Sequence, residues 1–283
     1  MEHARVSGLY VYPVKSMKGI AVQEATLTPK GLEHDRRWMV VRADGRFMTQ
    51  RDEPGLALIH TRLDEHGVTL SRDGHGSIFI PFESAGGEPV QTRIWQDDCA
   101  AQDEGDDVSG WLSAALGSKE PVRLVRMAAG FERPQSQPQR FGAANTMVFA
   151  DAAPFLVANE SSLERLNREL GAQGVAPVPM NRFRPNVVVR GLQPFAEHRA
   201  AMLGSEGWSL ALVDHCVRCL VTTVVQETGQ RDPAREPYQT LRRLNPAPGE
   251  KSPPAFAQNA VLGSGAGARI AVGAALTLSP ASR

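Results

Sequence analysis

Two of the three cysteines of the chain, Cys216 and Cys219, lie in one Cys-x-x-Cys motif with Arg218 between them. A guanidinium beside a thiol favours the thiolate, which is the soft ligand that transition metals prefer. The motif leaves three roles open: a metal ligand, a redox pair, or two buried and inert thiols. A closed zinc site usually takes four ligands, and the chain has neither a second Cys-x-x-Cys nor a histidine pair at zinc spacing. A redox motif begins a helix, whereas the residues that follow here, 220–225, are typical of a strand.

Three further segments place cations next to predicted strands. Lys15 and Ser16 follow a predicted strand and precede a glycine turn, which suits a phosphate although the P-loop signature is absent. Arg36 and Arg184 lie among aromatic residues just before predicted strands, and a guanidinium fork binds phosphate or carboxylate oxygens. Taken singly, each segment is more commonly an ordinary surface loop or an exposed salt bridge. Together with the cysteine motif they fit a cofactor that carries both a phosphate and a thiophilic metal.

The composition excludes several classes of protein. The 283 residues include 31 basic and 31 acidic side chains, so the net charge is zero and a dedicated nucleic-acid binder is not expected. A hydrophobic content of 42% supports a packed core, and three cysteines do not form a disulfide scaffold. No segment approaches the roughly 20 apolar residues that cross a bilayer, and the N-terminus lacks the pattern of a signal peptide. We therefore predict a cytoplasmic protein that does not associate with membranes.

The elements that must position these residues are mostly strands. The first hundred residues predict short antiparallel strands, with an Asp44-Gly45 hairpin between residues 38–41 and 46–49. Further strands are predicted at 6–12, 20–28, 56–63, 68–71, 78–81, 186–190, 208–213, 220–225 and 270–278, helices at 107–116 and 159–170, and long connections at 128–143 and 226–258.

At this point the sequence resembles the MOSC family, the molybdenum cofactor sulfurase C-terminal domain, preceded by its associated N-terminal β-barrel domain. The branch that it resembles includes the amidoxime-reducing components of mitochondria and their bacterial relatives. The matching segments are YPVKSMKG from Tyr12, DRRW from Asp35, MTQRDEP from Met48, NRFRPNVVV from Asn181 and CVRCLVTTV from Cys216. Residues 236–241 and 256–259 continue the match, so the resemblance covers nearly the whole chain in order. The combination is specific, although no single motif is.

The resemblance implies a fold and a cofactor. The fold would be mainly β with some α: an N-terminal antiparallel β-barrel-like domain at 1–105 and a MOSC β-barrel domain with peripheral helices at 106–283. The first strand could pack with either domain. Cys219 would be the protein thiolate on the molybdenum of the molybdenum cofactor. The remaining implied cofactor contacts are Lys15, Ser16 and Arg36 at the phosphate end of the pterin, Arg184 and Asn186 from the other domain, and Arg218 beside the metal ligand.

The expected activity is the reduction of N-hydroxylated or N-oxygenated small molecules. Because the chain has too few cysteines for an iron–sulfur cluster of its own, the electrons would come from a separate reductase. The sequence departs from the family at Ala152 and Ala153, where relatives often carry hydroxyls, and at Val225-Gln226, where the family has Asp-Pro. A segment after residue 193 that is usually acidic and contains tryptophan also differs. These departures concern the substrate pocket more than the cofactor site.

Two alternatives stay open at this stage. The chain could be a carrier of the molybdenum cofactor or of persulfide sulfur, in which case Cys216 would matter as much as Cys219. It could also be a zinc-bound structural module. We interpret Cys99 as a lone thiol without a partner, and assign no role to His215, the one histidine near the proposed site.

Overall fold

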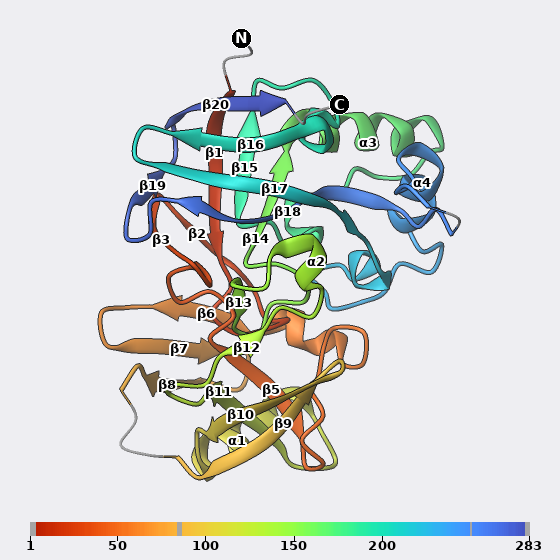
Figure 1. Cartoon of the computed structure of the whole chain (residues 1–283). Helices are drawn as coiled ribbons and strands as arrows, with labels where there is room; N and C mark the ends of the chain where they lie inside the picture. The colour runs from red at the N-terminus through yellow and green to blue at the C-terminus, as the bar shows by residue number, and fades with distance from the viewer. Residues whose placement is uncertain (1–3, 84–86, 250, 281–283) are drawn as a thin grey trace.

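The computed structural model describes residues 4–83, 87–249 and 251–280, and its centre is a closed barrel of seven strands. Neighbouring strands run antiparallel except β14 and β15, and β1 closes the barrel by pairing with both β20 and β15 (Figure 1). In order around the barrel the strands are β15 (Val187–Arg190), β14 (Phe155–Asn159), β18 (Ala255–Ser264), β17 (Trp208–Val217), β16 (Ala200–Ser205), β20 (Ala275–Pro280) and β1 (Ala4–Val11). The first strand of the chain is thus part of the same barrel as the last.

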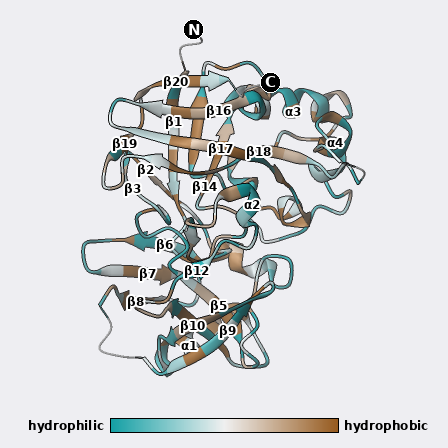
Figure 2. Cartoon of the chain, viewed as in Figure 1, coloured by the Kyte–Doolittle hydropathy of each residue, from teal (hydrophilic) through white to brown (hydrophobic). Residues whose placement is uncertain are grey.

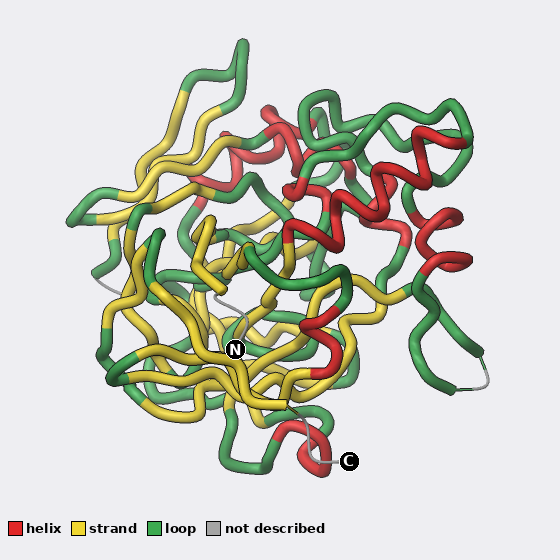
Figure 3. Tube along the Cα trace, turned by 90° about the horizontal axis from the view of Figure 1, so that it is seen from above, coloured by secondary structure: helices red, strands yellow, loops and turns green. Residues whose placement is uncertain are grey.

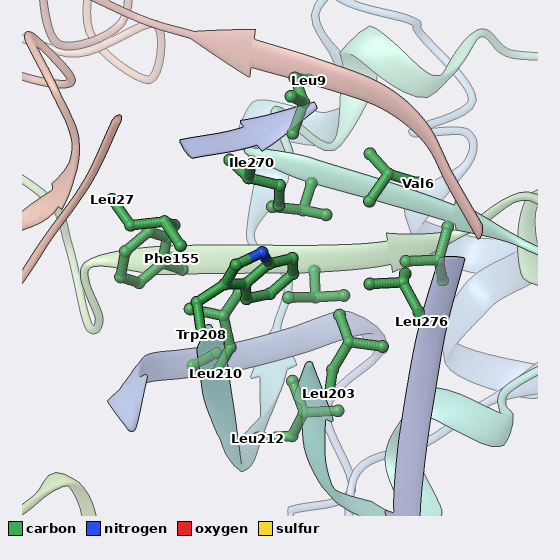
Figure 4. Packing of buried hydrophobic residues seen from close by; sticks show 14 of the residues in the cluster. Val6, Leu9, Leu27, Phe155, Leu203, Trp208, Leu210, Leu212, Ile270 and Leu276 are labelled. Carbon is green, nitrogen blue, oxygen red and sulfur yellow. The ribbon is translucent and has the colours of Figure 1, made fainter. Parts of the chain in front are cut away.

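The barrel interior is filled by aliphatic and aromatic side chains from every strand. Trp208 packs among leucines of β16 and β17, and Phe155 lies beside Leu27 at the left of the view (Figure 4). In Figure 2, hydrophobic residues run along β14 and β18, whereas the connecting turns are mostly hydrophilic. β14 is buried on both faces because the barrel core covers one side and α3 (Glu160–Ala172) packs on the other.

Two of the helices lie together on one side of the barrel. α3 begins at Asn159, whose side chain caps the helix by accepting a hydrogen bond from the backbone N–H of Ser161, and buries Leu166 and Leu170. α4 (Tyr238–Leu244) packs beside α3, as Figure 3 shows from above. The short helices η2 (Met180–Arg182), η3 (Ala196–Arg199) and η4 (Leu220–Thr223) lie in connections between barrel strands.

The other half of the molecule contains two smaller antiparallel sheets. One has the strand order β5 (Trp38–Arg42), β11 (Val122–Met127), β10 (Asp97–Asp103) and β9 (Pro89–Ile94), and α1 (Asp106–Leu116) packs on β11. The other is β6 (His60–Leu63), β7 (Gly67–Ser71) and β8 (Ser77–Pro81). A second hydrophobic core between them includes Trp38, Leu70 and Leu112. Two short helices remain, η1 (Pro54–Leu58) and α2 (Pro138–Phe141). β12 (Arg133–Pro134) pairs with β13 (Thr146–Met147), and β2 (Ile20–Val22) lies beside β1. A three-stranded sheet is made of β4 (Gly31–Leu32), β3 (Glu24–Thr28) and β19 (Arg269–Ala271).

The prediction of a mainly β fold with a few helices is confirmed, and both predicted helices form. Several local predictions were wrong, including the strands at 20–28 and 270–278, which are each divided in two. Residues 220–225 form the 3₁₀ helix η4 rather than a strand, and 56–63 divides into η1 and β6. The turn at Asp44-Gly45 forms, but its second arm makes only isolated bridges. The connections at 128–143 and 226–258 contain α2 and α4.

Candidate functional site

A cavity of about 270 Å³ opens where one end of the barrel meets the other half of the chain. All the residues that the sequence nominated line it, although they come from segments far apart in the chain. The loop after β1 contributes Lys15 and Ser16, the segment before β5 contributes Arg36, the segment before β15 contributes Arg184 and Asn186, and the end of β17 contributes Arg218 and Cys219.

The cysteine motif lies at the end of β17, where the chain leaves the barrel. Cys219 is exposed. Cys216 is partly buried and packs against the hydrophobic cluster that contains Leu166 and Leu170 of α3. Arg218 donates from Nη1 to Sγ of Cys216 over 2.8 Å and from Nη2 to the carbonyl of Phe183 over 2.9 Å. Burial raises the pKa of the Cys216 thiol even though Arg218 acts in the opposite direction. The two thiols are therefore not equivalent: Cys219 faces the cavity freely and Cys216 is held by Arg218.

Two guanidinium groups flank the ring of Tyr12. The Cζ atoms of Arg36 and Arg184 lie 4.4 and 4.3 Å from the ring centroid, which is a cation–π geometry. Nη2 of Arg36 also donates to the carbonyl of Arg184 over 3.2 Å. Burial raises the pKa of Tyr12 to about 12, and burial together with nearby Arg36 lowers the pKa of Arg184 to about 10. The stack thus holds two guanidinium groups side by side, and Asp35 offsets part of their charge by pairing with Nη1 of Arg36 over 2.5 Å.

Three of the nominated residues have strained backbones. Ser16, Arg36 and Arg184 have φ angles of 68°, 47° and 56°, in the left-handed region that side chains other than glycine rarely adopt. Such strain persists only where the surrounding structure imposes it, and it clusters at functional sites. Here, Gln50 donates to the carbonyl of Ser16 over 2.7 Å, and the N–H of Arg36 donates to the carbonyl of Tyr12 over 2.7 Å. The shape of the three turns therefore aims these residues at one cavity.

Lys15 is a buried residue of the cavity lining and has a carboxylate partner. Its Nζ donates to the carbonyl of Phe149 over 2.8 Å and to Oδ1 of Asp151 over 2.5 Å. Burial lowers the pKa of Lys15, although Asp151 acts in the opposite direction. Burial alone would raise the pKa of Asp151, but the charge and hydrogen bond of Lys15 hold it below its usual range. The pair is a fixed charge pair at the cavity rather than a free lysine awaiting a phosphate.

Asn186 is placed at the cavity, but its amide is already engaged. Oδ1 accepts from the N–H of Leu156 and Nδ2 donates to the carbonyl of Tyr10, both over 3.2 Å. The side chain thus ties together β14, β15 and β1, and only 1% of the residue is exposed. Its implied contact with a cofactor stays a prediction.

Sequence reasoning missed several lining residues, notably Asp151 and the ion pair between Arg140 and Asp214 (2.5 Å). Arg140 lies in α2, within a segment interpreted as a loop without periodicity. Asp151 directly follows a buried apolar run, and this position was the only signal that could have nominated it. Ala152 and Ala153 line the cavity as well, so any contact there is made by backbone groups.

The cavity lining fits an anionic cofactor with a soft metal. Two buried guanidinium nitrogens at the cavity, Nη2 of Arg184 and Nε of Arg218, lack a protein partner, and the exposed thiol of Cys219 shares the same space. A buried donor without an acceptor is costly unless a ligand supplies one. Across the residues that the structure describes, no three His, Cys, Asp or Glu side chains gather into a group that could hold a metal by themselves, so the zinc alternative has no ligand set there. No helix in the described segments is long and apolar enough to cross a membrane.

Comparison with known proteins gives two family matches. The MOSC N-terminal beta barrel domain matches residues 3–119, and the MOSC domain matches residues 144–276. The mitochondrial amidoxime-reducing component 1 of Mus musculus is 35% identical over 247 residues, which cover 84% of this chain and 70% of that protein. The Homo sapiens protein of the same name is 33% identical over 84% of this chain and 71% of its own length. A molybdenum cofactor sulfurase of Bos taurus is 28% identical over 80% of this chain but only 27% of that protein.

Proposed function

Because the chain belongs to the MOSC-domain family that includes the amidoxime-reducing components, we propose that it is a molybdenum-cofactor-dependent oxidoreductase for N-hydroxylated or N-oxygenated compounds. The names of its relatives support this activity. The observation that carries the proposal is one exposed thiol, Cys219, at the end of a cavity lined by cations from both halves of the chain. Reduction of an N-hydroxyl group consumes two electrons and two protons and releases one water.

Each residue of the cavity would have a distinct task. Cys219 would bind the molybdenum through its thiolate. The guanidinium groups of Arg36 and Arg184 would bind the phosphate end and orient the organic part, and Ser16 lines the same cavity. Lys15 would act through its charge and would hold Asp151 in place. When bound, the cofactor would supply the two-electron chemistry that removes oxygen from nitrogen.

The electrons would come from a separate reductase. We expect no iron–sulfur cluster in this chain, because its three cysteines are too few for the usual four thiolate ligands. The substrate would be a small molecule, as the names of the amidoxime-reducing relatives suggest.

Metal analysis tests the proposal directly. Protein made in a host that synthesises the cofactor should contain molybdenum, Cys219→Ser should lose it, and Cys216→Ser, the matched control two positions from Arg218, should retain it. The wild type should also reduce benzamidoxime with a chemical electron donor. Wild-type protein without molybdenum from such a host would refute the proposal.

One observation favours a second function, transport of the cofactor or of sulfur. Arg218 contacts the sulfur of Cys216 rather than that of Cys219, and a guanidinium in that place would stabilise a thiolate or persulfide. A carrier would bind the cofactor or sulfur without reducing amidoximes, and Cys216→Ser would then impair it as much as Cys219→Ser. Unchanged turnover in Cys216→Ser would exclude the carrier function.

A further inference from the structure

The turn between β9 and β10 exposes a tryptophan at the mouth of the cavity. Trp95 is 44% exposed and has a φ angle of 56°, which a bulky aromatic residue seldom adopts. Its indole N–H donates to Oδ1 of Asp151 over 3.1 Å, and Asp151 in turn pairs with Lys15. A large apolar ring is thus fixed in solvent by a bond to the cavity lining, although its own backbone is strained. Neither the N-terminal core nor the cofactor contacts proposed above require this arrangement.

An arginine covers the ring of Trp95. The Cζ atom of Arg51 lies 4.3 Å from the ring centroid, and Phe47 meets the ring edge-on at 5.1 Å between centroids. Nε of Arg51 is 3.4 Å from the hydroxyl of Thr49, at the limit of a hydrogen bond. Among the described residues, no carboxylate forms an ion pair with Arg51. Arg51 nevertheless lies close enough to Asp151 to help lower the pKa of that carboxyl, so it is a cation without a direct ion pair, resting over an aromatic ring.

A second, outer cavity adjoins the central cavity, and the two share lining residues. Thr49 and Arg51 line both the central cavity and an outer one, which Arg46, Arg93 and Trp95 also line. Arg46 and Arg93 face Asp44 and Asp98 at 3.5 and 3.4 Å, so their charges are partly offset. Asp52 also lines the outer cavity, where its Oδ2 accepts from the N–H of Thr49 over 3.2 Å. Arg51 is thus the arginine of this lining that has no ion-pair partner among the described residues, and it lies next to an exposed aromatic ring.

We propose that the platform of Phe47, Arg51 and Trp95 is a substrate-specificity site that selects planar substrates carrying an anionic group, such as a carboxylate, on the end remote from the N–O group. The inference rests on the proposed function, because it places the N–O end toward Cys219. The planar part would stack on the exposed indole, and the anion would accept from the guanidinium of Arg51. Stacking on Trp95 and charge pairing with Arg51 act at adjacent side chains, so a flat aromatic acid would gain from both.

Steady-state kinetics on paired substrates test the site. Benzamidoxime and 4-carboxybenzamidoxime differ only in the remote carboxylate. In Arg51→Gln we expect the KM for the carboxylated substrate to rise by about fivefold, the worth of one partly exposed ion pair, while the KM for the neutral parent stays within about twofold. Arg51→Lys should keep part of the effect because the charge remains. Arg62→Gln, an exposed arginine on β6 away from both cavities, is the matched control.

Equal effects on the two substrates, or none on either, would overturn the proposal. So would a change confined to the concentration of reductase needed for turnover, since that result would assign the platform to docking of the electron donor.

A binding measurement separates this site from the activity itself. Among the four tryptophans, Trp95 is the one that stands among the exposed large hydrophobic residues, so 4-carboxybenzamidoxime should quench fluorescence in the wild type, less in Arg51→Gln, and not in Trp95→Phe. Quenching that depends on Arg51 in protein that reduces no amidoxime would refute the proposed function and leave the site standing. Turnover without preference for the carboxylated substrate, and without quenching, would refute the site alone.

Discussion

The three cysteines differ in environment more than in chemistry. Cys219 is exposed at the cavity, Cys216 is partly buried beside Arg218, and Cys99 is fully buried in the core of the N-terminal half. Burial raises the pKa of Cys99 to about 11 and also raises that of Cys216. Since the thiolate is the reactive species, a raised pKa and a lack of access both slow reaction with an electrophile.

Alkylation of cofactor-free protein should therefore be strongly ordered. At pH 8, iodoacetamide should modify Cys219 first. Cys216 should react at least about tenfold more slowly, and Cys99 should react only on unfolding. Peptide mass mapping over time measures the order, and the same protein in urea, where all three should react alike, is the control. Rapid labelling of Cys99 in folded protein would contradict the placement of that thiol.

The sequence motifs identified residues that share one cavity, but they did not identify the side chains that bond to those residues. Lys15, Arg36, Arg184 and Cys219 were found because cations and a thiol next to strand ends are unusual in a sequence. Asp151 was not, because a single carboxylate after an apolar run becomes informative only once the fold brings it to within 2.5 Å of Lys15. The contact between Lys15 and Asp151 joins residues 136 positions apart, so it depends on the folded barrel and cannot be inferred from either segment alone.

At the scale of elements, one buried amide joins three strands at the cavity. Asn186 precedes β15 and bonds the backbone of Leu156, at β14, and of Tyr10, at β1. It therefore supports the same barrel end that carries Arg184.

Asn186→Ala should lower the free energy of unfolding by about 2–3 kcal/mol, because it leaves one buried backbone donor and one buried acceptor without partners. Urea denaturation monitored by circular dichroism measures the loss. Asn181→Ala, whose amide bonds Glu227 at the surface, should change stability by less than about 0.5 kcal/mol. If the two variants were equally stable, Asn186 could not be the tie between the strands.

Elements with a clean alternating or helical pattern were predicted well, and those governed by local hydrogen bonds were not. Residues 220–225 have the composition of a strand, yet the hydroxyls of Thr222 and Thr223 donate to the carbonyls of Cys219 and Leu220 over 3.0 and 2.7 Å. These bonds offer the backbone an alternative to a ladder and close a 3₁₀ turn. Pro54, together with the Glu53 carboxylate that accepts from the N–H of Gly55, similarly begins η1 where a strand was expected.

At the scale of the whole molecule, the chain crosses between its two halves more than once. β1 belongs to the seven-stranded barrel, whereas α1 and β11, over a hundred residues later, belong to the other half. Lys15, Ser16 and Arg36 reach the cavity from the connections that follow β1, and Cys219 reaches it from β17. The site is therefore complete only when both halves are folded together, which no pattern within a single segment could reveal.

Without β1, the barrel should not close. A chain of residues 106–283 lacks the strand that pairs with both β15 and β20, and it leaves the edges of both strands open to other chains. We expect this fragment to lose the near-ultraviolet circular dichroism of the full chain and to aggregate, while a synthetic peptide of residues 4–22 added during refolding should restore part of the signal. The same peptide with its residues scrambled is the control. A fragment that unfolded cooperatively without the peptide would mean that β1 only lines the barrel and does not close it.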